Sequence, residues 1–332
     1  MFELFMDAGW LNMTGIIEMG YPFTLVTGAR QIGKTYGSIK YCMDNHIPFV
    51  YMRRTDKELK ASKSDALSPF KKLDPDIQGK TIAGDVIGFY KGMDLIAPGV
   101  ALTTMHNVRG ISGAAYKKII YDEFIPETIA RPIKGEFDAW TNAYETLNSN
   151  RELEGEEPMQ MIALANSNNA ANPIFMGLRL VQVMEKMKTN HKILWTDDRR
   201  GILLVNVEGS PISQKKKKTT ALGKLTSGTD FARMAYENDF AFDDFSNIGS
   251  KSLKEYRPVV TVGEVTIYRH KSRKEYYCSL HLAGSAPAVY GTSEREIEAF
   301  SRGSGKLRDA YLDGSMLFEN YLAKVLFIKY TS

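Results

Sequence analysis

Short apolar runs alternate with helical stretches through the first half of the chain. The apolar runs predict a hairpin over Val86–Ala97 and strands at Phe23–Thr27, Phe49–Met52, Val100–Thr104, Ile119–Tyr121 and Met159–Ala165. Apolar side chains at helical spacing predict helices at about Lys34–Met43 and at Phe137–Leu147. Buried strands that alternate with helices are typical of a mainly parallel sheet with both faces covered. We therefore expect an α/β domain over residues 1–195.

The pattern changes after Trp195. Residues 196–225 contain Pro211, several glycines and the lysine run Lys215–Lys218, which together predict a basic linker. Alternating and helical apolar patterns farther along predict two strands and then two helices, at Val259–Tyr268, Tyr276–Leu282, Ile297–Phe300 and Met316–Ile328. We expect a small α+β domain over residues 226–332.

Composition and charge narrow the class of protein. A chain of 332 residues, 43% of them hydrophobic, suits a globular protein of two domains. No run of about 18 uncharged apolar residues occurs and the N-terminus lacks a basic region, so we expect neither a membrane span nor a signal peptide. Two distant cysteines, Cys42 and Cys278, favour reduced thiols in a cytosolic setting. The whole excess of the +4 net charge follows Trp195, which is weak support for a nucleic-acid partner.

The segment after the first predicted strand matches the phosphate-binding pattern G-x-x-x-x-G-K-[ST]. Glycines let the backbone wrap an anion with its N–H groups pointing inward, and the following helix aims its positive end at that anion. Lys34 would reach the β- and γ-phosphates of ATP, and the Thr35 hydroxyl would bind Mg²⁺. Arg30 contacts either the γ-phosphate, a neighbouring subunit or only solvent. The residues expected at the nucleotide are Gly28, Ala29, Arg30, Gln31, Ile32, Gly33, Lys34, Thr35 and Tyr36.

Two carboxylates, Asp122 and Glu123, follow the predicted strand Ile119–Tyr121. An aspartate at such a strand end can hold the water shell of Mg²⁺, so we predict a metal site at Thr35 and Asp122. The next residue points to the other side and can deprotonate the attacking water, which predicts Glu123 as the catalytic base of an ATPase. A GTPase is disfavoured because the chain has no N-K-x-D guanine motif. Asn166, after the next strand, either senses the γ-phosphate, positions water or only shapes a turn.

Several basic residues are candidates for further roles. Ring-forming ATPases often complete the site with a cation from the neighbouring subunit, a role open to Arg109 and Arg151. A surface ion pair is the alternative for each of these arginines. The candidates for DNA contacts are Arg53, Arg54, Lys57, Lys60, Lys215, Lys216, Lys217 and Lys218. A solvated helix face or loop is the alternative interpretation of these side chains.

Four segments occur in an order that resembles one family. The segments are Gly28–Thr35, Phe49–Arg54, Ile119–Phe124 and Ala165–Pro173. Together they resemble the genome-packaging (encapsidation) ATPases of φ29-like tailed bacteriophages over about residues 20–180. The resemblance implies a RecA- and terminase-like ASCE ATPase that forms a pentameric ring on the portal vertex of a procapsid in the bacterial host cytoplasm. That ring would use ATP hydrolysis to drive double-stranded DNA inward.

The resemblance also implies a C-terminal domain similar to the RNase H-like nuclease domain of large terminases, with the nuclease site lost. The acidic residues of this region form no clear metal-binding trio in the sequence: Asp230, Asp239, Asp243, Asp244 and Glu264. Contacts of this domain or the linker with DNA, the portal or a packaging RNA are implied as well, and the use of a packaging RNA stays open.

The resemblance leaves two questions open. Family members can carry another arginine where this chain has Ser149, so the role of the cation acting in trans passes to Arg151 or Arg109. The alternative functions are another DNA-dependent ring ATPase, such as a helicase-like translocase or a terminase with an active nuclease, and an ATP-dependent assembly switch. Glu123 argues against the switch, because a catalytic base serves hydrolysis.

Overall fold

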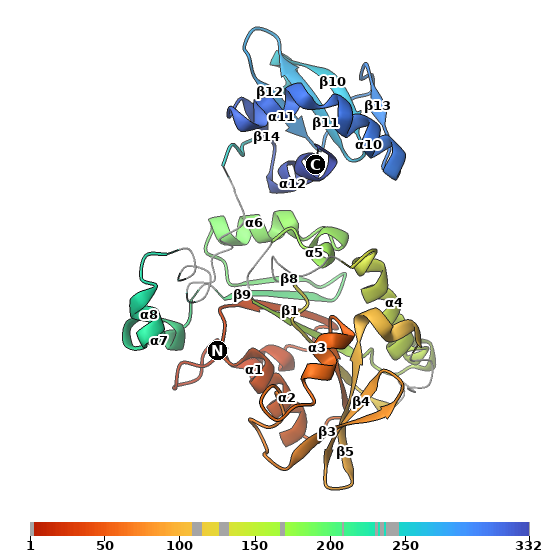
Figure 1. Ribbon diagram of the computed structural model, residues 1–332, viewed down its shortest axis with the longest axis vertical. Helices are drawn as coiled ribbons and strands as arrows, with labels where there is room; N and C mark the ends of the chain where they lie inside the picture. Colours follow the sequence, from red (N-terminus) through yellow and green to blue (C-terminus); the bar gives the residue numbers. More distant parts are fainter. Residues whose placement is uncertain are drawn as a thin grey trace. The chain divides into compact units, whose positions relative to one another are not determined.

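The structure is a computed structural model that describes residues 3–107, 115–125, 133–166, 170–207, 209–229, 232, 236 and 246–331. The chain divides into two compact units (Figure 1). The first comprises Met1–Gly177 and Lys186–Phe242, and the second comprises Leu178–Glu185 and Asp243–Ser332. No helix in the described ranges is long and apolar enough to cross a bilayer.

A nine-stranded sheet forms the centre of the first unit, in the order β3-β4-β5-β2-β6-β7-β1-β9-β8. Its strands are β1 (Phe23–Gly28), β2 (Phe49–Arg53), β3 (Ile77–Ala83), β4 (Val86–Lys91), β5 (Asp94–Ala101), β6 (Lys118–Asp122), β7 (Gln160–Ala165), β8 (Leu194–Asp197) and β9 (Ile202–Val207). The six strands from β5 to β9 in this order are parallel, and β3, β4 and β8 are antiparallel to their neighbours. The prediction of a mainly parallel sheet is confirmed.

Helices cover both faces of this sheet (Figure 1). They are α1 (Met13–Glu18), α2 (Lys34–Asp44), α3 (Asp56–Ala61), α4 (Glu136–Asn148) and α5 (Pro173–Gly177). The first unit also contains α7 (Pro211–Thr219), α8 (Ala221–Leu225) and the 3₁₀ turns η1 (Leu102–Asn107) and η3 (Arg151–Glu154). Successive β1 residues point to opposite faces. Val26 packs into the core that includes residues of α1 and α2, whereas the Phe23 ring contacts Trp140 and Tyr144 of α4.

The predicted boundary at Trp195 is wrong. Trp195 lies inside β8, and β8 pairs with β9, which lies beside β1 in the large sheet. The predicted linker over residues 196–225 therefore begins with a core strand, because the apolar run Ile202–Val207 is fully buried. The lysine run lies on the helix α7, where Ser210 caps the N-terminus and Pro211 occupies the first turn.

The second unit contains a five-stranded sheet in the order β13-β10-β11-β12-β14. Its elements are η4 (Leu253–Glu255), β10 (Tyr256–Val262), β11 (Val265–His270), β12 (Tyr276–Ser279), β13 (Val289–Tyr290), α10 (Glu294–Gly303), α11 (Gly305–Leu312), β14 (Met316–Phe318) and α12 (Tyr321–Thr331). The helix α6 (Val181–Thr189) spans residues of both units. The helix predicted from Met316 is wrong at its start, because Met316–Phe318 pairs with β12 as a strand. The likeness to RNase H stays a prediction.

Parallel strands of the large sheet bring their carboxyl ends to one edge. There β1 leads into the segment Gly28–Lys34, β2 ends at Arg53, β6 ends at Asp122 and β7 ends before Asn166. The fold thus gathers residues that are far apart in the sequence into one place.

Candidate nucleotide-binding and hydrolysis site

The phosphate-binding loop has the backbone that its glycines require. Gly33 precedes α2 with φ of +100°, a conformation that disfavours any side chain. At Gly28, an added Cβ would lie 2.7 Å from the Ile32 side chain and 3.2 Å from Val207 Cβ. Glycine is needed at Gly28 because the loop closes tightly against β9.

Lys34 lies across the loop. Its ammonium donates hydrogen bonds to the carbonyl oxygens of Gly28 and Ala29, at 2.7 and 2.8 Å, and to Asn166 Oδ1 at 3.2 Å. Burial lowers the pKa of Lys34 to about 7, although Asp122 and Glu123 favour the charged form. A bound anion would restore the charge, so the site is prepared for phosphate.

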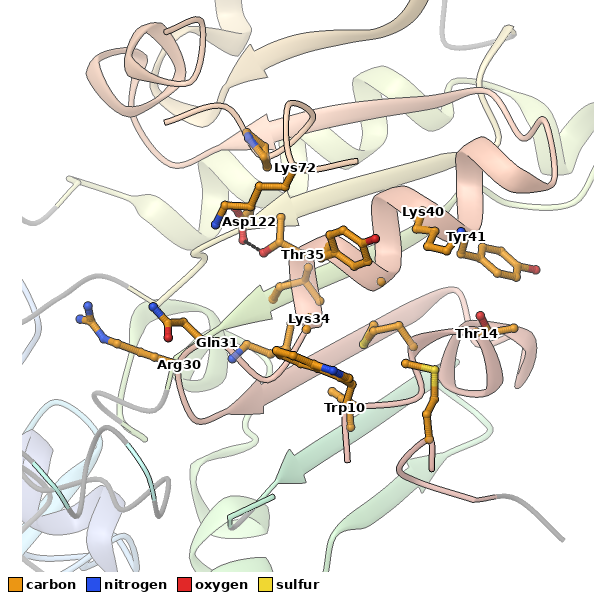
Figure 2. Close-up of a pocket in the computed structure, with 18 of the residues that line it drawn as sticks. Trp10, Thr14, Arg30, Gln31, Lys34, Thr35, Lys40, Tyr41, Lys72 and Asp122 are labelled. Atoms are coloured by element: carbon orange, nitrogen blue, oxygen red, sulfur yellow. Dashed lines mark hydrogen bonds between the residues drawn. The ribbon is translucent and has the colours of Figure 1, made fainter. Parts of the chain in front are cut away.

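A pocket of about 860 Å³ surrounds this lysine (Figure 2). Of the residues predicted at the nucleotide, six line it: Arg30, Gln31, Gly33, Lys34, Thr35 and Tyr36. The side chains of Ala29 and Ile32 are buried in the core instead, so these two side chains hold the loop in place. Asp122, Glu123 and Asn166 line the same pocket, as the sequence predicts for one site.

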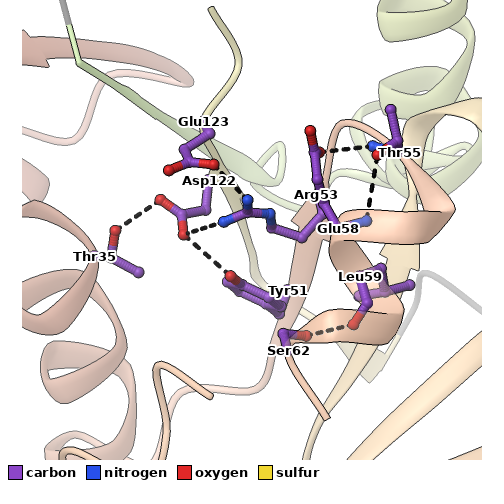
Figure 3. A network of polar contacts seen from close by, with 9 residues as sticks. All are labelled: Thr35, Tyr51, Arg53, Thr55, Glu58, Leu59, Ser62, Asp122 and Glu123. Atoms are coloured by element: carbon purple, nitrogen blue, oxygen red, sulfur yellow. Dashed lines mark hydrogen bonds and ion pairs between the residues drawn. The ribbon is translucent and has the colours of Figure 1, made fainter. Parts of the chain in front are cut away.

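Asp122 is the centre of a polar network (Figure 3). It accepts hydrogen bonds from Thr35 Oγ1 at 2.7 Å and from the buried Tyr51 hydroxyl at 3.0 Å. Arg53 adds an ion pair at 2.9 Å. Hydroxyl and carboxylate oxygens are the ligands that Mg²⁺ takes, directly or through water, so Thr35 and Asp122 fit a magnesium ion bound with phosphates. Tyr51 and Arg53 orient the carboxylate.

Glu123 has an unusual backbone and a cationic partner. Its φ is +60°, which is uncommon for a residue with a side chain and is often found at functional sites. The half-exposed carboxylate pairs with Arg53. Partial burial raises the pKa of Glu123, while the positive charge of Arg53 opposes that rise. A carboxylate with a raised pKa is better suited to accept a proton near neutral pH.

Two predicted DNA contacts are corrected. Arg53 faces Asp122 and Glu123, so it belongs to the hydrolysis site. Arg54 is only 2% exposed and its guanidinium pairs with Glu136 of α4 through two contacts of 2.5 and 2.9 Å. Arg54 therefore serves the protein interior, whereas Arg53 is engaged by the two carboxylates of the hydrolysis site.

Of the two arginines predicted to act at a neighbouring subunit, the structure describes only Arg151. Arg151 is 7% exposed and binds the Tyr116 carbonyl at 2.5 Å and Glu156 at 3.2 Å within its own chain. This burial argues against a role for Arg151 at a neighbouring subunit. Arg109 lies outside the described residues. Lys57 and Lys60 are exposed on α3, where Lys60 pairs with Asp56, so their DNA contacts stay a prediction.

The lysine run does not act as one surface. Lys215 and Lys218 are exposed, and Lys217 is half-buried. Lys216 instead lines the nucleotide pocket, where it binds Gln31 and lies over the Trp10 ring. Sequence reasoning missed Trp10 and Lys72 of the same pocket. No sequence signal marked either residue, because both reach the loop only through tertiary folding.

Comparisons with known proteins identify a family and similar proteins. A model of the podovirus DNA encapsidation protein (Gp16) family matches residues 9–272. A DNA packaging protein of Bacillus phage B103 is 24% identical over 323 residues, which cover 91% of this chain and 94% of that protein.

Two solved structures share the fold. The chain from the bacteriophage Phi-29 viral genome packaging motor assembly has a TM-score of 0.67 at 20% identity, covering 99% of this chain and 100% of that chain. The Phi-28 gp11 DNA packaging motor has a TM-score of 0.62 at 18% identity, with 98% of each chain covered.

Proposed function

The chain belongs to the podovirus DNA encapsidation protein (Gp16) family, and we propose that it hydrolyses ATP to move double-stranded DNA into a procapsid. The observation that carries the proposal is the shared pocket of Lys34, Thr35, Asp122 and Glu123. These residue types combine phosphate binding, metal binding and proton transfer in one place. A protein that only binds nucleotide has no need of a catalytic base such as Glu123.

Each residue has a distinct role in hydrolysis. Lys34 and the loop amides hold the phosphates, while Thr35 and Asp122 hold Mg²⁺, which when bound neutralises charge on the phosphate oxygens. Glu123 accepts a proton from water as the water oxygen bonds to the γ-phosphorus and the bond to the bridging oxygen breaks, releasing ADP and phosphate. The ion pair between Arg53 and Glu123 must weaken for this transfer, because the guanidinium occupies the carboxylate that accepts the proton.

The motor acts as part of an assembly. The proposed partners are double-stranded DNA, the portal (connector) of the procapsid and further copies of this chain in a ring, with five copies implied by the family resemblance. The ring acts on the portal vertex in the bacterial host cytoplasm, and a packaging RNA is a further candidate partner. Lys57 and Lys60 remain candidates for DNA contacts on the first unit, and so do Lys215 and Lys218 of α7, since all four side chains are exposed. A cation from a neighbouring subunit completes the site, and Arg109 is the candidate that stays open.

DNA-stimulated ATP turnover tests this proposal. Glu123→Gln should lower kcat by about 10²- to 10⁴-fold, the usual contribution of a general base, while ATP affinity stays within a few-fold. Lys34→Ala should lose ATP binding itself. Glu18→Gln, an exposed change of the same chemistry, is the matched control and should behave as the natural protein. Normal turnover by Glu123→Gln would contradict the assignment, and ATP binding without any turnover would favour the assembly switch.

A further inference from the structure

The outer side of the phosphate-binding loop is held by two donors from outside the loop. Lys216 of α7 donates to the Gln31 carbonyl oxygen at 3.2 Å and to Gln31 Oε1 at 2.8 Å. The backbone N–H of Leu11 donates to the Ile32 carbonyl oxygen at 3.0 Å. Two successive loop carbonyls are therefore fixed by segments that are distant in sequence.

Each of these carbonyls shares a peptide plane with the N–H of the next residue. Fixing the Gln31 and Ile32 carbonyls therefore also fixes the N–H groups of Ile32 and Gly33. In a planar trans peptide the C=O and the next N–H point in opposite directions. The Ile32 and Gly33 N–H groups therefore point away from Lys216 and Leu11. In the described part of the chain neither N–H has a hydrogen-bond partner. Loop amides without partners are the donors that such loops offer to phosphate.

The position of Lys216 is itself built by packing. Its ammonium lies 5.6 Å from the centre of the Trp10 ring, and Trp10 packs over Gly33, where an added Cβ would lie 3.5 Å from the ring. Gly9 brings this segment against the start of α7, since an added Cβ there would lie 2.9 Å from Pro211 Cβ. Among the described residues Lys216 forms no ion pair. Its charge is not engaged by any described carboxylate.

We propose that Lys216 is a positioning residue for ATP, which holds the Gln31–Ile32 peptide so that the Ile32 N–H points at the phosphates. The ammonium also polarises this peptide, which strengthens the N–H as a donor. Gln31 needs such support, because its φ is +58°. The inference rests on the proposed nucleotide site and assigns Lys216 to it, in place of the DNA contact predicted from the lysine run.

Binding of ATP with Mg²⁺ to the full chain tests the role of Lys216 by calorimetry. Lys216→Gln should weaken binding about fivefold to tenfold, the effect of losing one partly exposed charge-assisted hydrogen bond. Lys215→Gln, an exposed neighbour in the same run, should stay within twofold of the natural protein. Lys216→Arg should recover most of the loss, because a guanidinium can also donate to Gln31.

An amide signal separates positioning from simple charge attraction. In the natural protein, ATP should shift the Ile32 amide proton in an NMR spectrum, and Lys216→Gln should reduce that shift while the Gly33 shift, supported through Leu11, persists. Weaker binding with an unchanged Ile32 shift would overturn the proposal, since only charge would then have been lost. Equal affinity for Lys216→Gln and Lys215→Gln would overturn it as well. If Lys34→Ala still loses binding in that case, the proposed function stands, whereas no binding by the natural protein would contradict the function itself.

Discussion

Replacing Arg54 by methionine tests the buried ion pair between the end of β2 and α4. Arg54 and the Glu136 side chain are 2% and 1% exposed, and two contacts join them. Arg54→Met leaves the Glu136 carboxylate buried without this cation. Removing one partner of a buried ion pair lowers the free energy of unfolding by about 3–5 kcal/mol, because the remaining charge has neither water nor a counter-ion around it.

The magnitude is large enough to measure in the full chain. With an m-value of about 3 kcal/mol/M in urea, the urea midpoint for unfolding of the first unit should fall by about 1–1.7 M. Fluorescence of Trp140 reports the transition, because this buried tryptophan lies on α4 with Glu136. Lys57→Met, an exposed change near the same strand, is the matched control and should change stability by less than about 0.5 kcal/mol.

A double variant separates the lost ion pair from lost packing. Arg54→Met with Glu136→Leu removes both charges, so it should regain most of the stability that the single variant loses. A loss below about 1 kcal/mol in Arg54→Met would refute the reasoning. So would a double variant no more stable than the single one. In either case Arg54 would return as a candidate for a DNA contact.

Two further predictions concern protons at the hydrolysis site. Lys34 has a pKa of about 7 in the free protein, so at pH 8 it is mostly neutral, and ATP binding should take up about one proton as the phosphates restore the ammonium. Calorimetry in buffers of different ionisation enthalpy measures this uptake, and its persistence in Lys34→Arg, charged throughout, would contradict the assignment. Arg53 opposes the raised pKa of Glu123, so Arg53→Gln should raise that pKa further. Because the base acts deprotonated, the acid limb of kcat against pH should move to higher pH, and an unmoved limb would count against Glu123 as the base.

The elements that carry the ATP site could be predicted because each combines a local pattern with a chemical motif. An apolar run followed by the glycine-bearing loop became β1 and α2, and another followed by two carboxylates became β6. Their meeting also follows from general rules, since parallel strands place their carboxyl ends at one sheet edge. The network of Thr35 and Asp122 follows from these rules.

What could not be predicted depends on contacts between distant segments. Arg54 and Glu136 are 82 positions apart, and Lys216 and Gln31 are 185 positions apart, so a basic side chain in the sequence does not reveal whether it faces solvent. The run from Met316 was also ambiguous, because apolar periodicity alone does not separate a short strand from a helix. The pairing of Met316–Phe318 with β12 makes this segment a strand, and that pairing cannot be read from the local sequence.

DNA packaging by the assembled motor is the most direct test of the account. Procapsids of the same phage are mixed with DNA, ATP and either the natural chain or Glu123→Gln, and DNA protected from DNase is measured. The account predicts that the natural chain protects DNA only with hydrolysable ATP, and that Glu123→Gln protects none while still binding ATP. Protection by Glu123→Gln at the natural level would contradict the claim that hydrolysis at this site drives the DNA.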